Sequence, residues 1–224
     1  MKRIQAISQL ADFIATIHLD HPVRVGIDGV DCAGKTMLAD ELVDPIHQRG
    51  RKVIRASIDG FHNPREKRYR QGRKSPRGYY EDSFNIDAVL SCLLLPLGPD
   101  GSRSYTTRVF DFRIDSFVKS RELNAGDNDI LIFEGVFLHR PEFFPHWDFT
   151  VFVDTGFDVT IRRAFLRDQY LFKTENNTRE IYEQRYIPGQ VHYIREHSPS
   201  KKANVVFRND DIESPEIIVQ KPFD

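Results

Sequence analysis

The chain has 224 residues, of which 40% are hydrophobic and 29% charged, and its formal net charge is −1. This size suits one α/β domain with a substantial core, and the balanced charge offers no overall field for nucleic acid or an anionic membrane surface. The cysteines, Cys32 and Cys92, lie in different expected elements, which fits a reducing compartment such as the cytoplasm. No stretch approaches the ~20 apolar residues of a membrane helix, and the N-terminal residues do not read as a signal peptide.

Strands and helices alternate along most of the chain. Apolar and β-branched runs predict strands at residues 23–28, 51–59, 130–133, 149–154 and 205–207. Apolar residues three and four apart predict helices at residues 3–18, 37–48, 84–97, 158–172 and 179–197. Gly50 is expected to end the second helix, Ser83 to cap the third, and Pro188 with Gly189 to bend or break the last. The alternation predicts a three-layer α/β fold, with helices on both faces of a mostly parallel sheet.

One domain is expected to span residues 1–224, with three appendages. Residues 60–82 are mostly polar, basic and aromatic and predict a flap. Aromatic residues among charges at 104–119 predict a β-hairpin or paired short strands, and a lid is expected at about 162–180. The flap contains seven cations, which indicate either a solvated loop or an electrostatic funnel for phosphates or a phosphorylated acceptor. These cations are Arg65, Lys67, Arg68, Arg70, Arg73, Lys74 and Arg77.

Residues 29–36 fit the pattern G-x-x-x-x-G-K-[ST] of phosphate-binding loops. The expected strand before them and the expected helix after them supply the context that the motif requires. The two glycines allow close approach of the backbone, and N–H groups at a helix start attract anions. Lys35 adds a positive charge, and Thr36 offers a hydroxyl to Mg²⁺. The expected nucleotide-binding residues are Gly29, Val30, Asp31, Cys32, Ala33, Gly34, Lys35, Thr36 and Met37, together with Arg163 from a later helix.

Three expected strands end in an acid: Asp59, Glu134 and Asp154. Ligands of parallel sheets lie at the carboxyl ends of the strands, so Asp59 and Glu134 face the outer phosphates if their strands neighbour the phosphate loop. One carboxylate can then hold Mg²⁺ while the other accepts a proton from an attacking hydroxyl, or orients it. The alternative for each acid is a solvated carboxylate at a strand end. The candidate metal ligands are Thr36, Glu134 and Asp59.

Aromatic side chains follow the first of these acids closely. Tyr79, Tyr80 and Phe84 either stack on a base or sugar ring or belong to the core, and the polar His62 favours a site because it lies three residues past Asp59. Arginines gather later, on the helix expected at 158–172. Those at positions 163 and 167 share a helix face, which indicates either a clamp on a transferred phosphoryl group or a basic surface helix.

With these residues in place, the chain resembles the uridine kinase and phosphoribulokinase group of P-loop kinases over most of its length. The resemblance rests on residues 29–36, 57–62, 110–112, 133–136, 152–155, 162–168 and 199–206. It implies ATP- and Mg²⁺-dependent phosphorylation of a sugar hydroxyl. It also implies that Asp59 is the catalytic base, Glu134 the acid that supports Mg²⁺, Arg167 the lid arginine and Phe110 an aromatic contact to the nucleoside.

The chain departs from that group at three places. Asp115 stands five residues beyond Phe110, where similar uridine kinases carry a base-reading histidine, and His62 stands where a tyrosine is usual. Residues 169–173 lack the extra lid arginines. The resemblance therefore covers the phosphoryl-transfer core better than the acceptor pocket. The candidate catalytic residues are Asp59, Lys35 and Arg167, and the candidate acceptor contacts are His62, Tyr79, Tyr80, Phe110, Asp115 and Arg185.

These features predict a kinase that transfers the γ-phosphoryl group of ATP to a hydroxyl of a small molecule, with a uridine- or cytidine-like nucleoside as the first candidate. A phosphorylated sugar, another riboside or a pantothenate-like alcohol remains an alternative acceptor. A nucleotide-dependent switch is the alternative of another class, although the chain lacks the Asn-Lys-x-Asp motif of GTPases. Neither nucleic acid nor a membrane is an expected partner, and the choice between ATP and GTP and a homo-oligomeric state are open.

Overall fold

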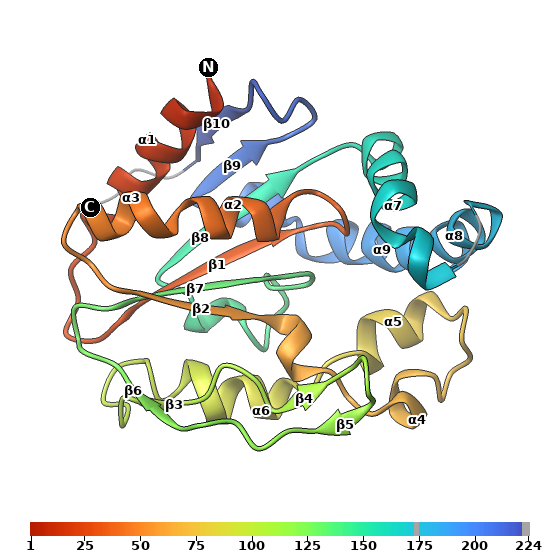
Figure 1. Ribbon diagram of the computed structural model, residues 1–224, viewed down its shortest axis with the longest axis horizontal. Helices are drawn as coiled ribbons and strands as arrows, with labels where there is room; N and C mark the ends of the chain where they lie inside the picture. The colour runs from red at the N-terminus through yellow and green to blue at the C-terminus, as the bar shows by residue number, and fades with distance from the viewer. Residues whose placement is uncertain (173–174, 221–224) are drawn as a thin grey trace.

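A six-stranded sheet forms the centre of the computed structural model, which describes residues 1–172 and 175–220, with the side chains of 168–176 outside the description (Figure 1). The strand order is β10-β9-β8-β1-β7-β2. All neighbours are parallel except β10, which runs antiparallel to β9 at the edge. The strands are β1 (Val23–Gly29), β2 (Val53–Ser57), β7 (Ile130–Gly135), β8 (Phe149–Asp154), β9 (Val205–Arg208) and β10 (Glu216–Val219).

Helices cover both faces of this sheet, which confirms the predicted fold class (Figure 1). The helices are α1 (Arg3–Ala15), α2 (Lys35–Glu41), α3 (Val43–Gln48), α4 (Arg65–Arg68), α5 (Pro76–Asp82), α6 (Ile86–Val89), α7 (Phe157–Phe172), α8 (Glu175–Ile181), α9 (Ile187–His197) and α10 (Pro199–Lys202). Helices α1, α2 and α3 pack on one face, and α5, α6 and α9 pack on the other. None of the described helices is long and apolar enough to cross a membrane.

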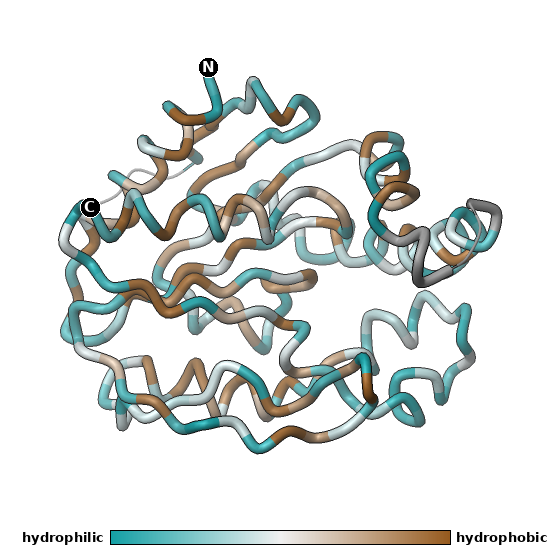
Figure 2. Tube along the Cα trace, in the orientation of Figure 1, coloured by the Kyte–Doolittle hydropathy of each residue, from teal (hydrophilic) through white to brown (hydrophobic). Residues whose placement is uncertain are grey.

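Strand β7 shows why the sequence has continuous apolar runs rather than alternation. Ile130 and Ile132 belong to the core beneath α1 and α2, whereas Leu131 and Phe133 belong to the core on the opposite face. Both side-chain directions of a strand are buried when helices cover both faces of a parallel sheet. Figure 2 accordingly shows hydrophobic stretches along the strands and hydrophilic stretches along the outer loops.

Several expected boundaries differ from the structure. The expected helix at 37–48 is divided in two, with α3 carrying Pro45 in its first turn. The next strand ends at Ser57, so Asp59 lies in the 3-10 turn Ile58–Phe61 rather than at a strand end. Ser83 follows α5 and is not the cap of the next helix, because the Asn85 side chain accepts the Ala88 N–H at 3.1 Å instead.

The appendages also have more structure than expected. The flap contains the helices α4 and α5. The region at 104–119 contains one complete antiparallel pair, β4 (Phe110–Asp111) with β5 (Ser116–Phe117). It also contains β3 (Ser104–Tyr105), which pairs with β6 (Leu123–Asn124) beyond the region. The expected helix at 179–197 consists of the end of α8, the π-turn Tyr182–Tyr186 and α9. The lid expected at 162–180 lies partly outside the described residues.

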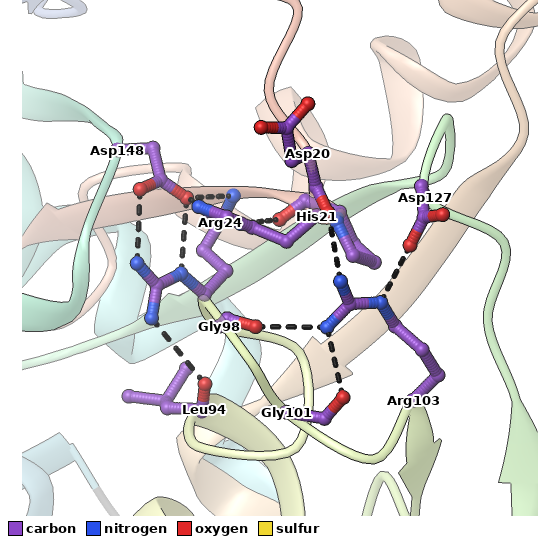
Figure 3. A network of polar contacts seen from close by, with 10 residues as sticks. Asp20, His21, Arg24, Leu94, Gly98, Gly101, Arg103, Asp127 and Asp148 are labelled. Carbon is purple, nitrogen blue, oxygen red and sulfur yellow. Dashed lines mark hydrogen bonds and ion pairs between the residues drawn. The ribbon is translucent and has the colours of Figure 1, made fainter.

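An ionic network fastens the amino end of the central strand β1 (Figure 3). Arg24 is 5% exposed, and its guanidinium binds both carboxylate oxygens of Asp148, at 2.9 Å and 3.0 Å. Asp148 is the residue that precedes β8. Nearby, Arg103 donates to the carbonyls of Asp20 and Gly98 and pairs with Asp127. The network therefore ties the sheet to the segment that leads into β3, at the end of β1 opposite the phosphate loop.

Candidate active site

The motif at residues 29–36 forms a loop between β1, at the middle of the sheet, and α2. Cys32 (φ 59°) and Gly34 (φ 99°) have left-handed backbone angles and turn the chain into the helix. A Cβ at residue 34 would lie 2.5 Å from the Nδ2 atom of Asn209, so the position also needs glycine for space. Lys35 is 8% exposed, and its Nζ donates to a carbonyl of the same loop at 2.7 Å. The loop is therefore folded around a buried cation.

The outer side of this loop is held through one carbonyl. The Ala33 oxygen accepts bonds from Asn209 Nδ2 at 2.7 Å, Thr155 Oγ1 at 3.2 Å and Arg163 Nη1 at 3.3 Å. Arg163 also donates to the carbonyls of Asn209 and Asp210. Its guanidinium thus braces the loop from behind, and Arg163 lines neither of the two pockets described below.

Glu134 lies on β7 directly beside the strand that carries the loop. Its register partner on β1 is Ile27 and on β2 is Ser57. The side chain is 6% exposed, and this burial raises the pKa of the carboxyl against the opposing effects of Lys35 and Ser57. Glu134 is therefore a carboxylate held in a partly desolvated position next to the buried cation of the loop.

Asp59 faces the same space from the 3-10 turn that follows β2. Its side chain is 61% exposed and lines both pockets described below, where desolvation by the surrounding protein, together with the nearby Asp31 carboxylate, raises its pKa. Lys35 and Arg167 act in the opposite direction. Asp31 and Lys35 belong to the phosphate loop, and Arg167 belongs to α7. The Asp59 carboxyl therefore lies where the loop and α7 approach each other.

Two adjoining pockets meet at these acids, and the residues common to both are Thr36, Asp59, Phe112, Arg113 and Glu134. The first has a volume of about 410 Å³ and extends along the hairpin to Arg108 and Phe110. The second has about 320 Å³ and extends under the flap and α7 to His62, Tyr79 and Arg167. The predicted loop, acids and lid arginine are therefore brought together around one shared wall.

Half of the candidate acceptor contacts line these pockets. Phe110 borders the first, and His62 and Tyr79 border the second. The His62 ring packs between Phe84 and Phe112, at centroid distances of 4.7 Å and 4.9 Å, and burial lowers its pKa to about 4. His62 is therefore a neutral aromatic wall at physiological pH.

The other three candidate acceptor contacts lie outside both pockets. The Tyr80 hydroxyl is 2.6 Å from His197 Nε2. Asp115 accepts from the Arg65 N–H and from Arg68 Nη2, at 2.9 Å and 2.8 Å, and so ties the hairpin turn to α4. Arg185 is 2% exposed and donates to four carbonyls of the flap. These three side chains stabilise the walls and do not reach the pocket interior.

The flap cations are largely paired with acids. Arg68 binds Asp115, and the other ion pairs are Arg70 with Asp82, Lys74 with Glu180, and Arg77 with Glu81. None of these four cations lines either pocket. The arrangement favours the interpretation of the flap as a solvated, internally paired segment over that of an electrostatic funnel.

Several residues in and behind the pockets were not predicted. Phe112 and Arg113 line both pockets, and Arg108 reaches the first because Gly60 has no side chain, a Cβ there lying only 2.7 Å from that of Arg108. These residues lie within three positions of Phe110 in the sequence, so the prediction for Phe110 could have been extended to them. Gln190, which binds the loop residue Asp31, gave no signal, because a glutamine on a helix resembles a surface residue.

The donors around the shared wall are hard oxygen ligands of the kind that Mg²⁺ prefers: the Thr36 hydroxyl and the carboxylates of Glu134 and Asp59. The part of the chain that the structure describes holds no cluster of three or more His, Cys, Asp or Glu side chains fit to bind a metal. Magnesium in phosphoryl-transfer sites is commonly held by one or two carboxylates plus substrate phosphates, so these residues fit that ion.

A phosphate loop in the middle of a parallel sheet, with acids from two neighbouring segments facing it, defines the P-loop class of nucleotide-binding folds. The model of the phosphoribulokinase/uridine kinase family matches residues 24–210, and the chain belongs to this family.

Individual relatives agree with this placement. Uridine-cytidine kinase B of Dictyostelium discoideum is 27% identical over 155 residues, 68% of this chain and 61% of its own length. Uridine kinase-like protein 5 of Arabidopsis thaliana is 27% identical over 166 residues, 71% of this chain and 34% of its own length. The chain thus spans less than two thirds of these curated relatives. The structure of a possible uridine kinase from Bacillus stearothermophilus has a TM-score of 0.71 and 26% identity, covering 90% of this chain and 97% of that one.

Proposed function

We propose that the protein is an ATP- and Mg²⁺-dependent kinase that phosphorylates a hydroxyl of a small molecule, and that this acceptor is a nucleoside of the uridine or cytidine kind. The observation that carries the proposal is the shared wall, where the phosphate loop, Asp59 and Glu134 face one another. The curated relatives named uridine or uridine-cytidine kinases support the acceptor class. Cys32 and Cys92 are not joined in a disulfide, which is compatible with a cytoplasmic location.

Each residue of the wall has a role in this proposal. Lys35 and the loop N–H groups hold the outer phosphates, while Thr36 and Glu134 hold Mg²⁺, which would neutralise phosphate charge when bound. Asp59 accepts the proton of the attacking hydroxyl or orients it, and its raised pKa makes it a stronger base than an ordinary aspartate. Arg167 stabilises the negative charge that develops on the transferred group.

The acceptor lies, in this proposal, between the hairpin and the flap. Phe110, Phe112 and His62 offer apolar ring faces near Asp59, which suit a flat base or a sugar face. Arg113 is a polar contact on the same side. Asp115 and Arg185 are not proposed as acceptor contacts, because both are engaged in holding the flap. The paired flap cations do not reach the pockets and so offer no support for a phosphorylated acceptor, although Arg55, Arg108 and Arg113 line the first pocket.

The test is an ATP-consumption screen over nucleosides, other ribosides, phosphosugars and pantothenate-like alcohols, with product detection by mass spectrometry. We expect ATP to be consumed in step with a phosphorylated nucleoside, and most rapidly with uridine or cytidine. A hit on another class would keep the kinase and replace the acceptor. Slow hydrolysis that ignores every acceptor would instead indicate a nucleotide-dependent switch.

A further inference from the structure

A fully buried acid lies directly behind the phosphate loop. Asp28 is 0% exposed, and one of its carboxylate oxygens accepts the N–H of Gly29, the first loop residue, at 2.8 Å. The other oxygen is 2.6 Å from His139 Nδ1 and also accepts the Tyr193 hydroxyl. Burial favours the protonated acid, but these donors outweigh it and hold the pKa of Asp28 below its ordinary value. A charged carboxylate therefore fixes the peptide where the loop begins.

The donors of this carboxylate are themselves interlocked. The Tyr193 hydroxyl, which donates to Asp28, accepts the backbone N–H of His139 at 2.8 Å. His139 follows the strand that carries Glu134, and Tyr193 belongs to α9. The side chain of His139 has no exposed surface, and its Nε2 has no hydrogen-bond partner among the described residues, so Nδ1 makes the polar contact of this ring, to Asp28.

Helix α9 also binds the middle of the same loop. The Gln190 amide donates to Asp31 Oδ2 at 2.6 Å, and its carbonyl oxygen accepts the Asp31 N–H at 3.3 Å. Gln190 and Tyr193 are three residues apart and so lie on one face of α9, and their partners Asp31 and Asp28 are also three residues apart. The helix therefore binds the loop region at two points, through the buried residues Gln190, 3% exposed, and Tyr193, 2% exposed.

We propose that α9 is a positioning element of the phosphate loop, and that Tyr193 and Gln190 set the loop conformation that binds nucleotide phosphates. Neither residue lines a pocket, so both act through Asp28 and Asp31 and are positioning residues. The inference rests on the proposed function only in requiring that a nucleotide binds the loop.

The same connection reaches the α7 side of the site. The Tyr182 hydroxyl, in the π-turn that leads into α9, lies 3.5 Å from Cys32 Sγ and accepts from Arg167 Nη2 at 3.2 Å. The Tyr182 hydroxyl thus contacts both the loop and the arginine of α7. The arginine and the loop are then placed together rather than independently.

The experiment measures ADP binding by calorimetry, since ADP is held by the loop and needs no acceptor. In Tyr193→Phe only the hydroxyl is lost, and we expect the Kd for ADP to rise about tenfold, if a loss near the lower end of what a hydrogen bond to a charged group contributes is passed on to the loop. Tyr80→Phe is the matched control. It loses a similar hydroxyl contact, to His197, in the same aromatic cluster without touching the loop, and its Kd should equal the wild-type value.

Gln190→Leu tests the second contact and serves if Tyr193→Phe does not fold; its Kd should also rise severalfold. Melting temperatures are measured in parallel, because a purely structural role would lower stability and leave the Kd unchanged. Wild-type affinity in a folded Tyr193→Phe or Gln190→Leu protein overturns the proposal, as does an equal loss in Tyr80→Phe. Absence of ADP binding by the wild-type protein would instead refute the proposed function, and the inference with it.

Discussion

At the scale of single residues, the chemistry depends most on one carboxylate. Replacing Asp59 by Asn keeps the size of the side chain but removes its ability to accept a proton. We expect Asp59→Asn to lower turnover by ~10²–10⁴-fold while the affinity for ADP stays within about twofold. Asp154→Asn is the control, because that acid ends β8, which lies beside the strand that leads into the phosphate loop, but lines neither pocket. Full turnover in Asp59→Asn would remove the residue from its proposed role.

The pH dependence follows from the same residue. The pKa of Asp59 is raised, first by the surrounding protein and then by the Asp31 carboxylate. A base works only when deprotonated, so kcat/KM should fall as the pH falls through this raised pKa, above the ordinary aspartate value. Asp31→Asn removes the neighbouring negative charge, so the acid limb of its pH profile should move to lower pH, whatever its absolute rate. An unmoved limb would show that another group titrates.

Cys32 provides a reporter within the loop. Its thiol is half-buried in the phosphate loop, whereas Cys92 lies in the π-turn Leu90–Leu94 that follows α6 and lines neither pocket. Bound ATP should cover Cys32, so we expect ATP to slow its alkylation by iodoacetamide, as followed by peptide mass spectrometry. Cys92 is the internal control, and its rate should not change. Equal rates with and without ATP at Cys32 would place the thiol outside the nucleotide site.

At the scale of elements, the sequence predicted the features that local patterns of residues determine, namely the buried strands and the phosphate loop. Strands β7 and β8 were found because burial on both faces leaves continuous apolar runs, and the loop between β1 and α2 was found because few other sequences tolerate its backbone. The helices within the flap were missed because they are short and mostly polar. The roles of Asp115 and Arg185 were missed because their partners lie 47 or more positions away in sequence. Such long-range pairing leaves no trace in local spacing.

Arg185 gives a prediction at this scale. Its guanidinium donates to the carbonyls of residues 68, 72, 73 and 75 and so holds the turn between α4 and α5. In Arg185→Lys, a compact ammonium cannot reach all four oxygens. We expect faster amide exchange and proteolysis at residues 68–76, with a higher KM for the acceptor and unchanged ADP affinity. Arg195→Lys, on the exposed side of α9, should change none of these, and a protected flap in Arg185→Lys would contradict this account.

At the scale of the whole molecule, stability and function are placed at opposite ends of the sheet. The loop and acids lie beyond the carboxyl end of β1, while the Arg24–Asp148 pair lies at its amino end (Figure 3). Helix α9 connects the core to the loop through Gln190, which binds Asp31, and Tyr193, which binds Asp28. Changes at the amino end should therefore alter the free energy of unfolding without altering the site in molecules that remain folded.

The Arg24–Asp148 pair tests this separation. The two side chains are 6% and 13% exposed, and Arg24→Met would leave the Asp148 carboxylate buried without its guanidinium partner. Breaking a buried pair in this way typically costs about 3–5 kcal/mol, which should lower the urea midpoint of unfolding markedly. Arg49→Met breaks a more exposed pair, in which Asp12 is 59% exposed, and should shift the midpoint far less.

Folded Arg24→Met protein should bind ADP like the wild type, because none of its altered contacts reaches residues 28–36. A loss of ADP affinity as large as that of Tyr193→Phe would mean that the two ends of β1 are coupled.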